Sequence, residues 1–138
     1  MKKTEQEEKP MVPGLMGKVE MVVEEKDLVS RLGGFGVDVL TTPRLVQLFE
    51  EAAIQAIKDY IPSGQVSLGA YVKIKHLSPT PLGMKVTAHA LLKEIDKNRL
   101  LFVIDAYDEV EKVAEGEHER ILVPRDRFLQ KVEKKRMR

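Results

Sequence analysis

The chain has 138 residues, 43% hydrophobic and 33% charged, which is the size and composition of one globular domain. It has no cysteine, which excludes disulfides, thiolate nucleophiles and Cys-ligated metals, and 23 basic against 22 acidic residues leave no net charge that would attract nucleic acid. No apolar run approaches the ~20 residues of a membrane span and no signal-peptide core is visible, so we expect a cytoplasmic protein without membrane or nucleic-acid partners.

Both ends of the chain are rich in charge and lack apolar periodicity. Six of the first ten residues are charged, and we interpret residues 1–14 as a disordered leader. Residues 131–138 hold five basic residues and one acid, which predicts a solvated basic tail that is able to attract phosphates. The domain itself is expected over residues 15–130.

One helix is predicted over residues 43–60. Thr42 followed by Pro43 is typical of an N-cap and a proline at the first helical position, and Pro62-Ser63-Gly64 ends the apolar pattern. The alanines at positions 52, 53 and 56 are small enough to let another element approach closely. A sheet wrapped around the helix would use this face.

The apolar period changes from 3.6 to 2 after the helix, which indicates strands. We predict strands over residues 66–76, 84–92, 100–107 and 113–123, with one more upstream over 18–25. Short connections predict that the last four strands form a meander of antiparallel neighbours. This is an α+β architecture, an antiparallel sheet wrapped around one long central helix, which is the hotdog fold. Its open sheet edges favour pairing with a second copy.

Several polar residues fall where the patterns expect apolar ones. On a helical wheel Glu50 shares an arc with apolar residues, so its carboxylate either needs a partner or reaches past them to water. His76 ends an inward series that starts at Val66, and its imidazole is either structural or part of a site on the helix side of the sheet. His118 and Arg120 are also in phase with the inward face of their strand.

Thr42 has two competing uses, as the helix cap or as a hydroxyl that faces a ligand at the helix N-terminus. The stretch Gly33-Gly34-Phe35-Gly36 lacks the Lys-Ser/Thr of a phosphate loop and is interpreted as a mobile loop. The three histidines show no metal-binding spacing, so we expect no metal.

The chain is similar to the fluoroacetyl-CoA thioesterase family of hotdog proteins over about residues 15–130. The resemblance is carried by Val39-Leu40-Thr41-Thr42-Pro43, Phe49-Glu50-Glu51-Ala52, Gly69, Lys75-His76 and Gly116-Glu117-His118-Glu119-Arg120. It implies a homodimer that binds acyl-CoA, with Thr42, Glu50 and His76 as the catalytic set. It also implies that Gly69 and Arg120 contact the substrate, and that CoA enters only as part of that substrate.

The resemblance implies a reaction at the start of the helix, where backbone N–H groups can stabilise an oxyanion. Glu50 would attack the thioester carbonyl or activate water, His76 would transfer protons, and Thr42 would position or accept the acyl group. The family's aromatic lid is represented here by Phe35 with Gly36 beside it. We therefore expect hydrolysis of a small acyl-CoA, and the sequence does not support a prediction of fluoroacetyl specificity.

Two other functions stay open at this point. One is an acyl-CoA-binding hotdog module that does not turn its ligand over. The other is an acyl-CoA hydratase, which would need an Asp/His pair near the helix start. Asp38 is the acid nearest that start in sequence and has no neighbouring histidine, so we rank the hydratase last.

Overall fold

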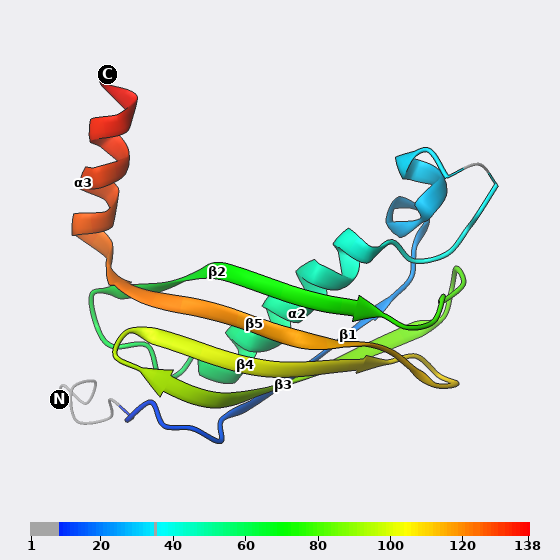
Figure 1. Cartoon of the computed structure of the whole chain (residues 1–138), viewed down its shortest axis with the longest axis horizontal. Coiled ribbons are helices and arrows are strands. Elements are labelled where there is room, and N and C mark those ends of the chain that lie inside the picture. Colours follow the sequence, from blue (N-terminus) through cyan, green and yellow to red (C-terminus); the bar gives the residue numbers. More distant parts are fainter. Residues whose placement is uncertain (1–8, 35) are drawn as a thin grey trace, which may run out of the picture.

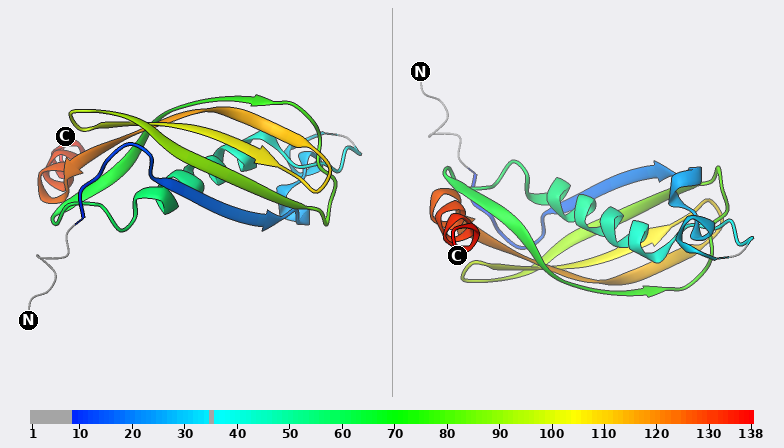
Figure 2. Two further views of the ribbon diagram at one scale, coloured as in Figure 1. Left: turned by 90° about the horizontal axis from the view of Figure 1, so that it is seen from below. Right: turned by 90° about the horizontal axis from the view of Figure 1, so that it is seen from above.

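A computed structural model describes residues 9–34 and 36–138, which form one curved sheet with a long helix against it (Figures 1 and 2). Strand β1 (Met16–Val22) leads into two short 3-10 helices, η1 (Glu25–Asp27) and η2 (Val29–Leu32), and then into helix α2 (Thr42–Ile57). The remaining elements, in chain order, are β2 (Gln65–His76), β3 (Lys85–Asp96), β4 (Arg99–Tyr107), β5 (Lys112–Pro124) and helix α3 (Arg125–Arg136).

The sheet is antiparallel throughout, and its strand order is β1-β3-β4-β5-β2. The predicted meander is therefore wrong in one respect, because β2 pairs with β5 and not with β3. The connection over residues 77–84 crosses the ends of β4 and β5, which lie between β2 and β3. Its eight residues can span ~26 Å, which exceeds the ~14 Å of the three strand spacings that it crosses. The Leu77 N–H donates to the Val113 carbonyl (2.7 Å) and holds this crossing against β5.

Helix α2 lies along the concave face of the sheet (Figure 2). Its buried residues include Leu48 and Phe49, which are fully enclosed. At Gly17 of β1 an added Cβ would overlap the backbone of Ala52 and Ala56, so this strand touches the helix directly. The close approach predicted from the small alanines is confirmed, and glycine is the residue that allows it.

A β-bulge interrupts β2 between Gly69 and Tyr71. An extra residue in a strand moves the following side chains to the other face, so the inward series predicted over residues 66–76 holds only after the bulge. Before it, Ser67 and Gly69 face α2, as the bond between Ser67 and the buried Arg120 shows. His76 faces the helix side as predicted.

The ends of the described chain are more ordered than the charge pattern suggested. Residues 9–14 belong to the predicted leader, but Met11 packs on the core and the Gly14 N–H donates to the Leu92 carbonyl (2.8 Å); residues 1–8 lie outside the described part. The basic residues 131–138 are helical as far as Arg136. Within the described residues, no helix is long and apolar enough to cross a bilayer.

Candidate active site

Thr42 and His76 meet at the start of α2. The Thr42 Oγ1 lies 2.7 Å from the His76 Nδ1. The N-cap of the helix is Thr41, whose Oγ1 accepts from the Arg44 N–H (3.3 Å), so the prediction that Thr42 caps the helix is wrong. Thr41 therefore caps the helix, and the exposed hydroxyl of the adjacent Thr42 is available to contact His76.

His76 is held as a neutral base. Burial lowers its pKa from the ordinary value of 6.5, and a backbone hydrogen bond at Ser78 opposes that shift only in part. The Nε2 is buried and has no hydrogen-bond partner among the described residues. With the ring proton on Nε2, the Nδ1 accepts the Thr42 hydroxyl proton, which is the polarity a general base needs.

Glu50 lies in the middle of α2, next to Gly69 of β2. It is half-buried, and its carboxylate makes no hydrogen bond or close ion pair with the described residues. A Cβ added to Gly69 would stand 2.9 Å from the Glu50 Oε2, so the missing side chain at Gly69 leaves the space that the carboxylate uses. Glu50 is therefore partly buried and has no bonded partner among the described residues.

Arg120 and His118 form a buried polar network beside Glu50. Arg120 is 6% exposed and donates from Nε to the Ser67 hydroxyl (2.9 Å), from Nη2 to the Ser67 carbonyl (3.0 Å) and from Nη1 to the His118 Nε2 (3.1 Å). His118 is fully buried, and its Nδ1 donates to the Tyr71 carbonyl (2.9 Å). The sequence analysis missed Ser67, because the unrecognised bulge put it on the wrong face.

The buried network fixes a cation close to the Glu50 carboxylate. Burial lowers the pKa of His118, so this ring is neutral, and its Nε2 is free to accept from Arg120. Burial also lowers the pKa of the Arg120 guanidinium, and the charge of Glu50 opposes that shift. Arg120 therefore offers a fixed positive charge at the spot where Glu50 and Gly69 meet.

Within the chain, these residues form two separate groups. Thr42 and His76 are together, and Glu50 is with Gly69 and Arg120. The eight residues from Thr42 to Glu50 cover ~12 Å along the helix axis. The seven residues from Gly69 to His76 cover on the order of 20 Å along β2. The Glu50 carboxylate and the His76 imidazole of the chain are therefore not in contact.

Asp27 is a buried acid near the helix start that the sequence analysis missed, because it sits in a charge-rich run. It is 4% exposed, and its carboxylate accepts from the Glu24 N–H (2.8 Å) and pairs with the Arg44 Nε (3.4 Å). This pairing ties η1 to the first turn of α2. Asp38, which the hydratase hypothesis used, is exposed. Phe35, the predicted lid residue, lies outside the described residues.

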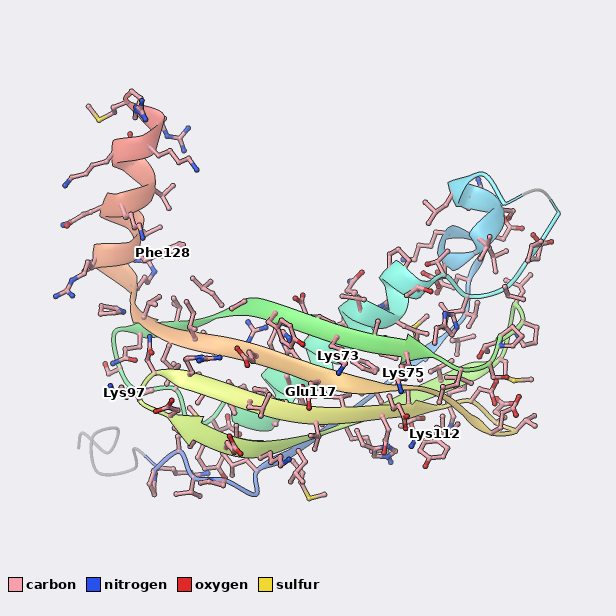
Figure 3. The ribbon with its side chains drawn as sticks, viewed as in Figure 1. Lys73, Lys75, Lys97, Lys112, Glu117 and Phe128 are labelled. Atoms are coloured by element: carbon pink, nitrogen blue, oxygen red, sulfur yellow. The ribbon has the colours of Figure 1, made fainter. Side chains whose placement is uncertain are left out.

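The far side of the sheet carries a separate hollow of about 480 Å³. Lys73, Lys75, Lys112 and Glu117 line it and point away from α2 (Figure 3). None of the six predicted site residues contributes to it, so it is distinct from the groups described above. In the described part of the chain, no three His, Asp or Glu side chains gather as a metal site would require.

Two comparisons of sequence bear on this arrangement. The family model described as fluoroacetyl-CoA-specific thioesterase matches residues 23–126. A fluoroacetyl-CoA thioesterase of Streptantibioticus cattleyicolor is 34% identical over 98 residues, which cover 71% of this chain and 70% of that protein. The matched segment contains every predicted site residue.

Solved structures show the same architecture. The crystallised fluoroacetyl-CoA thioesterase superposes with a TM-score of 0.84 at 30% identity, over 92% of this chain and 98% of that one. A hot-dog-like protein from Thermanaerovibrio acidaminovorans superposes with a TM-score of 0.83 at 24% identity, over 89% and 91% of the two chains. The predicted hotdog fold is confirmed.

Proposed function

The chain belongs to the fluoroacetyl-CoA-specific thioesterase family, and from that membership we propose that it hydrolyses a small acyl-CoA to the free acid and CoA. The observation that carries the proposal is the 2.7 Å contact between the Thr42 hydroxyl and the neutral His76, located at the N-terminus of α2. A hydroxyl, a base and free helix N–H groups at one point suit acyl transfer from a thioester.

The proposed reaction breaks the bond between the carbonyl carbon and the sulfur of CoA. Water supplies a hydroxyl to the acyl carbon and a proton to the departing thiolate. The Glu50 carboxylate, which has no bonded partner in the described part of the chain, activates the water or attacks the carbonyl itself, and His76 carries the proton. Arg120 places a fixed positive charge near the Glu50 carboxylate, and Thr42 positions the acyl group.

Because one protomer keeps Glu50 and His76 apart, we propose that the site is completed by a second copy. Strand β2 is one of the two edge strands of the sheet, and no strand of the described residues pairs with its outer side. An unpaired edge of twelve residues is suited to an isologous antiparallel pairing. A two-fold axis between Val72 and Lys73 would set His76 opposite Gly69 of the partner subunit, and hence beside the partner's Glu50.

The assay is thiol release over a panel of short acyl-CoAs. We expect Glu50→Gln and His76→Asn each to lower kcat by about 100-fold or more, because each removes a group that moves a proton in the transition state. The matched controls are Glu51→Gln, the adjacent acid that bonds to Gln47, and His89→Asn on the outer face. Equal rates in wild type and in both site variants would reject the proposal.

The second candidate is a module that binds acyl-CoA without turnover, and it gains support from the separation of Glu50 and His76 in a single protomer. Its signature is a CoA-dependent rise in Tm with no thiol release. Selectivity among small acyl groups, cytoplasmic location, independence of a resident cofactor and the lack of membrane or nucleic-acid partners stay predictions.

A further inference from the structure

Helix α3 stands off from the rest of the molecule. Phe128 is its half-buried residue, and every other residue of the helix is exposed (Figure 3). The Arg125 N–H donates to the Gly64 carbonyl (2.9 Å) and fixes the base of the helix beside the start of β2. In Figure 1 the helix rises past the β2 edge, in the direction open to a partner subunit. Packing among the described residues of one chain therefore accounts for the base of α3 but not for the position of its exposed remainder.

The charges of α3 are segregated around its axis. At 100° per residue, Arg127, Lys131, Lys134 and Lys135 fall within one arc of about 100°. We call these four residues the basic face. No acidic residue of the helix falls in that arc, and none of the four forms an ion pair with the described residues. The basic face therefore presents four cations that are not neutralised locally.

The other cations within α3 are arranged differently. Arg125 pairs with Asp126 (3.5 Å), and Arg136 pairs with Glu133 (3.2 Å). Both acids fall on the side of the helix away from the basic face. If the charges of a helix served solubility alone, acidic and basic residues would be expected on all its sides. In α3, two arginines are paired with acids, and the four cations of the basic face lie together without an acid among them.

Helix α3 would come near the proposed site only in the proposed dimer. In one protomer α3 begins at the Gln65 end of β2, and the Thr42–His76 pair lies at the other end of that strand. The two-fold axis proposed above runs the two β2 strands antiparallel. It therefore carries α3 of one subunit to the His76 end of the other, where the acyl end of the substrate would react.

We propose that the basic face of α3 binds the phosphates of CoA at the site of the partner subunit; this rests on the proposed function. CoA carries a diphosphate and a phosphate monoester, the latter with about −1.5 to −2 charges at neutral pH. A row of unpaired Lys and Arg side chains complements such a polyanion. The face would hold the nucleotide end while the pantetheine arm reaches toward His76.

Binding of free CoA tests this without requiring turnover. Calorimetry compares CoA with pantetheine, which lacks the nucleotide phosphates, on wild type, on K131Q/K134Q, and on the matched control R125Q/R136Q, whose two arginines are already paired. We expect the CoA Kd to rise about tenfold in K131Q/K134Q and to change less than about twofold in the control, because only the first variant loses two exposed charge pairs with the CoA phosphates. Pantetheine binding should be the same in all three proteins.

Kinetics provide the second arm, with one acyl group carried on CoA and on pantetheine. K131Q/K134Q should raise KM for the CoA ester at unchanged kcat, and leave the pantetheine ester unaffected. Equal CoA affinity in wild type and K131Q/K134Q, equal loss in the control, or no CoA binding by wild type would each overturn the inference. Selective loss of CoA affinity in a protein that cleaves neither ester would support the basic face and reject the hydrolase.

Discussion

The two polar groups along α2 are held in place by different means. Arg120 makes three hydrogen bonds in the interior, two to Ser67 and one to His118, and this network stands beside Glu50. The pair of Thr42 and His76 depends on one contact at 2.7 Å between an exposed threonine and a half-buried histidine. The carboxylate end of the site is therefore built into the core, whereas the hydroxyl and imidazole end is placed by the start of α2 and the end of β2.

The largest effect on stability should come from the buried network. Arg120→Met leaves the Ser67 groups and the His118 Nε2 without a donor, and each buried unsatisfied group costs about 1–3 kcal/mol. We expect the free energy of unfolding to fall by about 3 kcal/mol, measured by urea denaturation. Thr42→Val should change it by less than about 1 kcal/mol, because Thr41 is the cap. Similar losses in both variants would contradict the comparison.

Much of this arrangement was predictable because it depends on the apolar periodicity within single helices and strands. The helix over 43–60 corresponds to α2, and all five strands appear within a few residues of their predicted bounds. The two-residue alternation of the last predicted strand placed His118 and Arg120 on its inward face, and both side chains are buried. These inferences needed only the side-chain periodicity of single elements.

The features that the sequence did not predict depend on how one strand or helix is aligned with another. The bulge at Gly69 shifts the register by one residue. A glycine inside a strand is a signal of a bulge, but it was not used as one in the sequence analysis, so Ser67 was placed on the wrong face. The choice between Thr41 and Thr42 as the cap is one of register as well. The connection over residues 77–84 is long enough to leave β2 beside either β3 or β5. Its length therefore does not predict which of the two strands pairs with β2.

A smaller effect, on activity alone, should follow from Gly69→Ala. The new Cβ would stand 2.9 Å from the Glu50 Oε2 and push the carboxylate aside, while the strand backbone keeps a conformation that alanine accepts. We expect kcat to fall about 10- to 100-fold, since a displacement of the order of 1 Å costs that much in an active site. The free energy of unfolding should change by less than about 1 kcal/mol. A stability loss that matches the activity loss would show that Gly69 serves packing instead.

The smallest expected effect is a dependence of stability on pH. Burial lowers the pKa of His76 and of His118 below 6.5, so between the folded and unfolded pKa values the unfolded chain binds more protons. Stability is therefore complete above about pH 6.5 and decreases as the pH falls through that window. Urea denaturation from pH 8 to 5 should show this. His118→Asn should remove more of the dependence than His76→Asn, because His118 is fully buried; the reverse order would contradict the contrast between the two groups.

The central claim is that His76 of one subunit works with Glu50 of the other, and mixing inactive variants tests it directly. Glu50→Ala and His76→Ala homodimers, unfolded together and refolded at equal amounts, should regain about a quarter of wild-type activity. Half of the dimers are then mixed, and one of their two sites carries both wild-type residues. As a control, Thr42→Val mixed with His76→Ala should regain nothing, because those residues pair within one subunit. No recovery in the first mixture would contradict the account.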